Sequence, residues 1–188
     1  MKRSSAVASA LVILAVLTAG CGYNTIQTMD ERVNQAQGQI QAQLQRRADL
    51  IPNLVNTVKG VTKQEDTVFI SIANARARLG GAIQAGNVPE MAAANAALNT
   101  GLGRLIAISE NYPQLRSSEN FKQLQDQLEG TENRIAVARQ DYNGAVGEFN
   151  AYVRRFPYNL TAKIFGLGKP REYFEAQQGA TEAPKVQF

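Results

Sequence analysis

The stretch SENFKQLQDQLEGTENRIAVARQDYNGAVGEFNAYVRRF, residues 118–156, decides the fold class. Its apolar residues recur at alternating intervals of three and four, which predicts a long helix with a coiled-coil seam and excludes a strand. Ser117 or Ser118 is suited to cap the start of this helix, and Pro157 stops it. The predicted seam consists of Phe121, Leu124, Leu128, Thr131, Ile135, Ala138, Tyr142, Ala145, Phe149, Tyr152 and Phe156.

Helical patterns also precede and follow this stretch. Apolar spacing predicts one long helix over residues 24–79 with a bend at Pro52, and a second helix that opens at Pro89 and runs through Ile108. Residues 158–165 suit a short final helix. Such faces are buried most simply in an all-α antiparallel bundle. The predicted boundaries are a signal at 1–20, an anchor at 21–23, the bundle domain at 24–168 and a polar tail at 169–188.

The residue inventory excludes several classes of function. The chain has no His and one Cys, so it cannot build a Ser-His-Asp triad, a Glu-x-x-His di-iron site or a thiolate zinc cage. The formal charge of +4 falls to +2 without Lys2 and Arg3, which gives no basic face for nucleic acid. The sequence therefore predicts no catalytic residue, no metal, no cofactor and no nucleic-acid partner.

The first twenty residues have the pattern of an export signal. Basic Lys2 and Arg3 precede an apolar run of about 12 residues, which is shorter than the roughly 20 that span a membrane. The run ends in Leu-Thr-Ala-Gly-Cys, residues 17–21, which resembles the bacterial lipobox. We expect cleavage before Cys21, lipid attachment to its thiol, and stable anchoring by several acyl chains such as palmitate. Gly22, where Asp would signal retention, favours the outer membrane in a two-membrane cell.

Motifs along the mature chain resemble the LemA family. The segment Arg46-Arg47-Ala48-Asp49-Leu50-Ile51-Pro52-Asn53-Leu54-Val55 is similar to the signature of that family. Further matching pairs are Asn111-Tyr112-Pro113, Asn120-Phe121, Thr131-Glu132, Ala138-Arg139, Tyr142-Asn143, Phe149-Asn150 and Phe156-Pro157. The resemblance implies an antiparallel helical bundle on an N-terminal anchor that faces outward in a bacterial envelope. Many members keep an uncleaved N-terminal helix, whereas this chain carries a lipobox, and the family implies no established activity.

Three groups of side chains are candidate sites. Arg46, Arg47, Asp49 and Asn53 surround Pro52, either as a recognition patch or as residues that satisfy a broken helix and pair with neighbouring acids. The acidic stretch Glu119, Asp126, Glu129 and Glu132 is better explained as a charged face, with Glu132 and Arg139 in interhelical salt bridges. The aromatic stripe is better explained as core, while Asn143 and Asn150 either bridge to other helices or line a groove.

Three functions remain open on the sequence alone. The favoured one is a non-enzymatic envelope lipoprotein, held by Cys21, whose bundle acts as a scaffold or binding module for other envelope proteins. The alternatives are an enzyme that uses carboxylates alone and a membrane-remodelling or spacer protein. The oligomeric state stays open, because a coiled-coil seam closes equally well within one chain or between chains.

Overall fold

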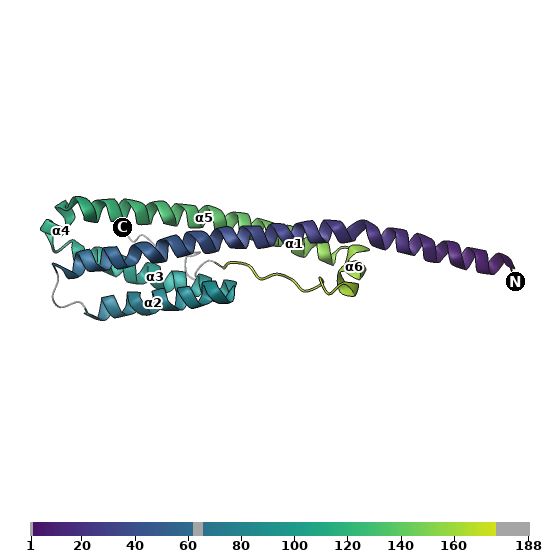
Figure 1. Ribbon diagram of the computed structural model, residues 1–188, viewed down its shortest axis with the longest axis horizontal. Helices are drawn as coiled ribbons and strands as arrows, with labels where there is room; N and C mark the ends of the chain where they lie inside the picture. Colours follow the sequence, from purple (N-terminus) through teal and green to yellow (C-terminus); the bar gives the residue numbers. More distant parts are fainter. Residues whose placement is uncertain (1, 62–65, 176–188) are drawn as a thin grey trace, which may run out of the picture. The chain divides into compact units, whose positions relative to one another are not determined.

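The computed structural model describes residues 2–61 and 66–175, with side chains from Gly22 onward (Figure 1). Its helices are α1 (Lys2–Lys59), α2 (Asp66–Ala85), α3 (Val88–Ser109), α4 (Pro113–Ser117), α5 (Glu119–Arg154) and α6 (Tyr158–Ile164). No strand occurs in these ranges, which confirms the all-α prediction. Of the expected signal at 1–20 only the helical backbone from Lys2 is described, and most of the expected tail at 169–188 lies outside the described residues.

The chain divides into two compact units that share its two longest helices. The first unit contains residues up to Gly38 together with 141–172, and the second contains residues 39–140 together with the chain from Tyr173 onward. Helices α1 and α5 each contribute one part to either unit. The first unit therefore holds α6 and the N-terminal part of α1, whereas the second holds α2, α3 and α4.

The second unit is an antiparallel arrangement of helices. Arg76 of α2 reaches Ala48 of α1, and the later residue Ile83 accepts a hydrogen bond from the earlier residue Gln41, so α2 runs antiparallel to α1. In the same way α5 runs antiparallel to α1, because Arg47 contacts Glu132 while the earlier Gln43 contacts the later Arg134. Between α2 and α3 the contact is close (Figure 1), since a Cβ added at Gly101 would lie 2.8 Å from Cγ1 of Ile72.

The predicted single helix over residues 24–79 is wrong, because the chain turns after Lys59. Gly60 donates to the carbonyl of Asn56, and Val61 closes a tighter turn onto the carbonyl of Val58. Glycine weakens a helix at this point, and the turn lets α2 fold back along α1. Pro52, where the sequence suggested the bend, lies inside α1 instead.

The seam of α5 is confirmed over most of its length. Phe121, Leu128, Thr131, Ile135, Ala138, Tyr142 and Phe149 are buried. After Tyr142 the buried track shifts by one residue to Val146 and Val153, because a helix with 3.6 residues per turn drifts against a strict heptad. Phe156 was predicted to end the seam, and this is wrong: its side chain is 79% exposed beyond the end of α5.

Local signals place most other boundaries as the sequence predicts. The side chain of Asn87 accepts a hydrogen bond from the amide of Glu90 at the start of α3, where Pro89 occupies the first turn. Gly86 precedes this cap with a φ of 63°, a conformation that glycine adopts without a steric penalty. The short helix predicted at 158–165 is α6, and Gly166, with a φ of 73°, follows it.

Candidate functional site

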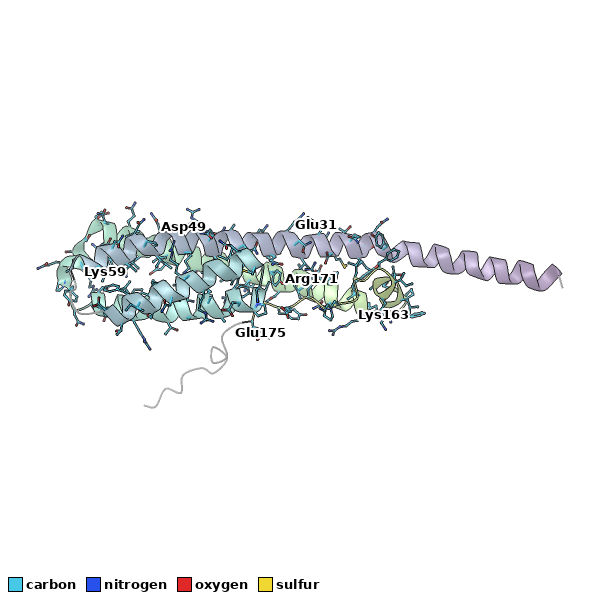
Figure 2. All side chains as sticks on the ribbon, turned by 60° about the horizontal axis from the view of Figure 1, so that its bottom comes forward. Glu31, Asp49, Lys59, Lys163, Arg171 and Glu175 are labelled. Atoms are coloured by element: carbon cyan, nitrogen blue, oxygen red, sulfur yellow. The ribbon has the colours of Figure 1, made fainter. Side chains whose placement is uncertain are left out.

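The sequence-predicted patch around Pro52 does not form one cluster. Arg46, Asp49 and Asn53 are exposed, and Asp49 lies on the outer side of α1, where it accepts a hydrogen bond from Gln45 at 2.8 Å (Figure 2). Arg47 alone points inward and is buried. The inward position of Arg47 could have been predicted from the sequence, because Arg47 lies three residues after Leu44 and four before Ile51, on the apolar face of the helix.

Arg47 is the charged centre of the second unit. Its Nη1 forms an ion pair with Glu132 of α5 and also donates to Oδ1 of Asn95 of α3 at 3.2 Å. Burial lowers the pKa of Arg47, while the charge and hydrogen bond of Glu132 act in the opposite direction. Its Nε is buried without a hydrogen-bond partner among the described residues. Arg47 thus joins three helices and is unavailable to a ligand at the surface.

The backbone defect that Pro52 creates is repaired by another helix. Proline has no amide hydrogen, so the carbonyl of Ala48, four residues earlier, loses its intrahelical donor. Nε of Arg76 in α2 donates to this oxygen at 2.8 Å. The patch residues themselves therefore do not supply the missing donor, which the sequence had suggested as their structural role.

The acidic residues of α5 do not converge in the second unit. Glu119, Asp126 and Glu129 are exposed, and Glu132 is taken up by Arg47. Within the described residues no group of three or more His, Cys, Asp or Glu side chains is arranged to hold a metal ion. These positions fit the charged-face interpretation of the sequence.

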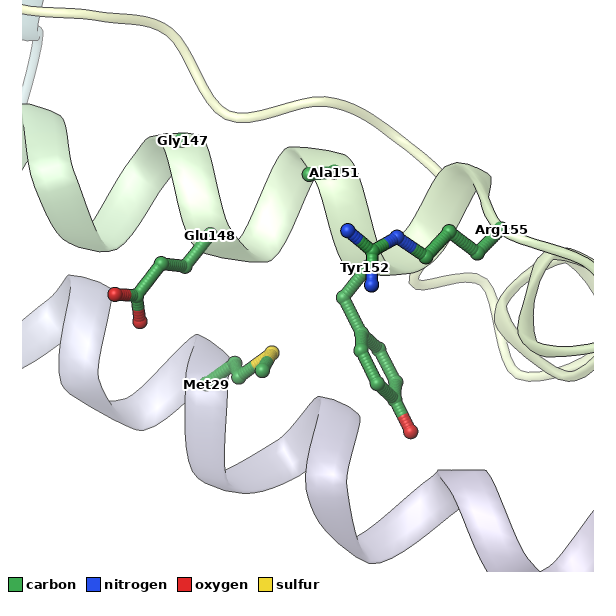
Figure 3. A pocket seen from close by; sticks show the side chains of 6 residues that line it. All are labelled: Met29, Gly147, Glu148, Ala151, Tyr152 and Arg155. Carbon is green, nitrogen blue, oxygen red and sulfur yellow. The ribbon is translucent and has the colours of Figure 1, made fainter.

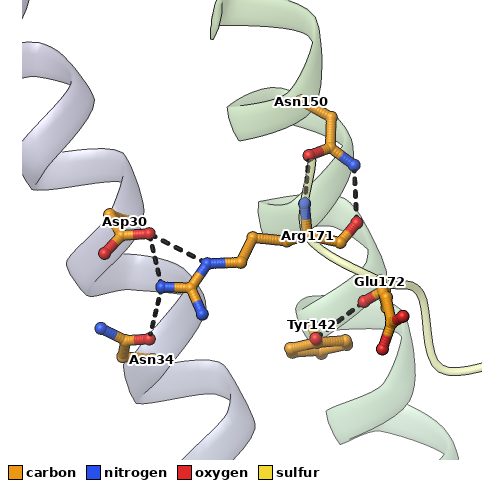
Figure 4. A network of polar contacts seen from close by, with 6 residues as sticks. All are labelled: Asp30, Asn34, Tyr142, Asn150, Arg171 and Glu172. Atoms are coloured by element: carbon orange, nitrogen blue, oxygen red, sulfur yellow. Dashed lines mark hydrogen bonds and ion pairs between the residues drawn. The ribbon is translucent and has the colours of Figure 1, made fainter. Parts of the chain in front are cut away.

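Sequence reasoning missed a polar network in the first unit. We call residues 166–172, which follow α6, the return segment. The side chain of Asn150 in α5 forms two hydrogen bonds with the backbone of this segment. It accepts from the amide of Arg171 at 2.8 Å and donates to the carbonyl oxygen of the same residue at 2.9 Å (Figure 4). The guanidinium of Arg171 in turn donates to Asp30 at 2.6 Å and to Asn34 at 3.2 Å on α1.

Tyr142 holds the end of the return segment. Its hydroxyl donates to the carbonyl oxygen of Glu172 at 2.8 Å (Figure 4). Burial raises the pKa of Tyr142 above its ordinary value of 10.0, partly offset by the positive charge of Arg171. The sequence offered one signal for this network, the amide of Asn150 beside the seam, but its partner proved to be the return segment rather than another helix.

A surface groove lies in the first unit between α1 and α5. It has a volume of about 380 Å³ and is lined by Met29, Gly147, Glu148, Ala151, Tyr152 and Arg155. Figure 3 shows Met29 on one wall, facing Glu148 and Tyr152 on the other. Glu148, Ala151 and Arg155 are exposed, so this is an open groove, and its lining is mostly apolar with one charge of each sign.

Comparison with known proteins identifies the family. The model of the LemA family matches residues 36–188. This chain belongs to the LemA family. The magnetosome proteins MamQ 1 and MamQ 2 of Paramagnetospirillum magneticum (strain AMB-1) are each 28% identical over 198 residues, covering 93% of this chain and 72% of theirs. The magnetosome protein MamQ of Magnetospirillum gryphiswaldense (strain MSR-1) is 25% identical over 182 residues, covering 85% and 67%.

The LemA motifs in this chain coincide with contacts that hold the bundle together. Arg47 of the signature segment pairs with Glu132 of a second motif. Asn150 clasps the return segment, and the guanidinium of Arg139 lies 6.0 Å from the ring centroid of Phe174, which is buried. In this chain the motifs thus take part in packing the bundle. Neither the family description nor the names of the relatives designates an enzyme.

The expected lipid-attachment site precedes the part matched to LemA. Cys21 lies within the helical span of α1, directly before Gly22. Gly22 is buried, and a Cβ added there would overlap the ring of Tyr158. The ring centroids of Tyr23 and Phe165 are 4.5 Å apart. Among the described helices, none contains an apolar run long enough to cross a bilayer.

Proposed function

We propose that this LemA protein is a lipoprotein of the bacterial envelope, tethered through Cys21. Its helical bundle acts without catalysis, as a scaffold that binds other envelope proteins. The bundle faces outward, on the periplasmic side, and belongs to the outer membrane where a cell has two.

The packing of α1 directly after Cys21 is the main support for the proposed tether. Gly22 is buried against α6, Tyr23 contacts the ring of Phe165, and Ile26 is fully buried. Packing therefore reaches the residue that directly follows Cys21, and no spacer separates the lipobox cysteine from the bundle. A lipid on that thiol would hold the bundle directly at the membrane surface.

Polar side chains in each unit form structural contacts, which favours a binding role over a catalytic one. Arg47, Glu132, Asn150 and Arg171 are engaged in contacts between helices or with the return segment. The alternative, an enzyme that uses carboxylates alone, needs two acids that converge in a recess. The groove in Figure 3 contains one acid, Glu148, and the acids of α5 in the second unit are exposed or paired.

The anchor is tested by replacing the thiol. In the native cell, intact-mass analysis of the wild-type protein should show residues 1–20 removed and a lipid on Cys21. Cys21→Ser should abolish the lipid and release or mislocalise the protein without altering its fold. Asn24→Ser, an exposed change three residues later, is the control and should leave processing unchanged. An intact Met1, an unmodified thiol in the wild type, or a Cys21→Ser variant that stays membrane-bound would contradict the proposal.

The scaffold role is tested by photo-crosslinking in intact cells. A photoreactive residue at Ala151 probes the groove of the first unit, and one at exposed Ala73 probes α2 of the second. A scaffold should yield the same protein adducts in repeated experiments from at least one position, whereas the buried position Ala94 serves as the control. Reproducible absence of adducts from both exposed positions would count against a protein-binding function.

A further inference from the structure

An exposed apolar cluster surrounds α6 in the first unit. Phe156 is 79% exposed, Leu160 52%, Ile164 75% and Phe165 55%. Leu160 and Ile164 are four residues apart and so lie on one face of α6, while Thr161 and Ala162 are buried on the other face. Scattered exposed apolar residues are ordinary, but four within ten residues concentrate apolar surface at one short helix, as is typical of an interaction site. We call these four residues the α6 patch.

The α6 patch adjoins the expected lipid-attachment site. Phe165, one of its members, contacts the ring of Tyr23, and Tyr158 at the start of α6 packs over Gly22. Tyr158 also stacks on Tyr152 of α5, with ring centroids 4.4 Å apart. Aromatic contacts therefore fix α6 to both long helices beside residue 22, and a lipid on Cys21 would bring the patch to the bilayer surface.

The chain segment that forms the α6 patch carries charge of one sign. Between Glu148 and Glu172 the chain contains five basic residues and no acidic one. Arg171 is paired with Asp30, but Arg154, Arg155, Lys163 and Lys169 are exposed, with Lys163 within α6 itself (Figure 2). Apolar side chains flanked by lysine and arginine are typical of helices that lie in the headgroup region of anionic membranes. A protein partner would need acidic side chains beside an apolar surface, whereas an anionic bilayer offers both apolar acyl chains and negatively charged phosphates.

We propose that the α6 patch lies in the interface of an anionic phospholipid bilayer and forms a second membrane contact beside the lipid on Cys21. The proposal rests on the lipid anchor proposed above. One lipid-modified residue alone leaves the bundle free to swivel. A second contact, with the apolar side chains in the acyl boundary and the basic groups at the phosphates, sets one orientation.

The absence of Trp from the chain provides a direct test. The full lipidated protein with Ile164→Trp is reconstituted into vesicles of phosphatidylethanolamine and phosphatidylglycerol that contain bromine-labelled lipid. The single indole should show blue-shifted emission and be quenched at least about two-fold more strongly than in vesicles without bromine. Val137→Trp is the matched control, because Val137 is also apolar and 57% exposed but lies outside the patch; its indole should not be quenched.

Vesicle flotation separates the possible outcomes. If the protein floats but the Ile164→Trp variant is quenched no more than the Val137→Trp variant, the α6 contact is refuted while the anchor stands. If the protein does not float, the anchor fails and the α6 contact fails with it. The charge argument predicts that Lys163→Glu with Lys169→Glu, or vesicles of phosphatidylcholine alone, weaken the quenching of the Ile164→Trp variant without preventing flotation. Unchanged quenching in both cases would overturn the anionic-lipid assignment.

Discussion

Nε of Arg76 donates a hydrogen bond to the main-chain oxygen of Ala48 at 2.8 Å. Ala48 lies four residues before Pro52, so this oxygen is the one that proline deprives of its helical donor. A side chain from α2 thereby allows α1 to continue through a proline. The same hydrogen bond links α2 to α1, the two helices that the turn at Gly60 separates along the chain.

This relationship predicts a coupling between positions 52 and 76. Arg76→Ala should lower the free energy of unfolding by about 1 kcal/mol, since a charged donor is lost from a partly exposed site. In a Pro52→Ala background the restored amide satisfies Ala48, so Arg76→Ala should cost clearly less. Urea unfolding of the four variants measures the coupling. Equal costs in both backgrounds would show that Arg76 acts independently of the proline.

The ion pair of Arg47 and Glu132 should contribute to stability chiefly because the buried charge of Arg47 does not tolerate the loss of its partner. Glu132→Gln leaves a buried guanidinium without its counter-charge and should cost about 2 kcal/mol, which is less than breaking a fully buried pair costs, because Glu132 is partly exposed. Adding Arg47→Met should recover part of this loss. Arg46→Met, the exposed neighbour, is the control and should change stability by less than about 0.5 kcal/mol.

Asn150 should determine whether the return segment stays docked. Asn150→Ala removes both hydrogen bonds to the backbone of Arg171 from a buried site and should cost about 1–3 kcal/mol. The amide of Arg171 should then exchange its hydrogen faster, and the segment should become open to proteases. Asn133→Ala, an exposed change on the same helix, should leave both measurements unaltered. Unchanged exchange at Arg171 in Asn150→Ala would contradict the assigned role.

Tyr142 should make the protein sensitive to alkaline pH. Burial raises its pKa in the folded state, so above about pH 10 the unfolded chain releases this proton first and the folded state loses stability as pH rises. Tyr142→Phe should be less stable than the wild type at neutral pH, because it lacks the hydrogen bond to Glu172. This difference in the free energy of unfolding should become smaller above about pH 10. Denaturation at a series of pH values measures the difference, with exposed Tyr173→Phe as the control. A difference that stays constant with pH would refute the predicted role of Tyr142.

Helix α5 offers two positions of opposite environment, two residues apart: one on the seam and one off it. Ile135 is fully buried, and Ile135→Ala should lower the free energy of unfolding by about 2–5 kcal/mol. Val137 is 57% exposed, and Val137→Ala should change it by less than about 0.5 kcal/mol. Comparable losses at both positions, measured by urea unfolding, would mean that Val137 is covered in solution.

The buried faces of the helices could be predicted because they are a local property. A helix repeats its inward side about every 3.6 residues, so Leu128, Ile135 and Tyr142 were identifiable from spacing alone. Proline signals such as Pro89 and Pro157 act on their immediate neighbours and were equally predictable from the sequence. The same reasoning failed at Lys59, because a single glycine is a weak signal beside an interior proline.

The sequence by itself determined the helical class, the seam and the family, along with the lipobox pattern on which the proposed anchor depends. Only the tertiary structure decided that Arg47 faces Glu132, that Arg76 repairs Pro52, and that the return segment lies against Asn150. The physical reason is sequence distance. Arg171 and Asp30 are 141 positions apart, and no local periodicity records which distant donor meets which acceptor once the helices have packed.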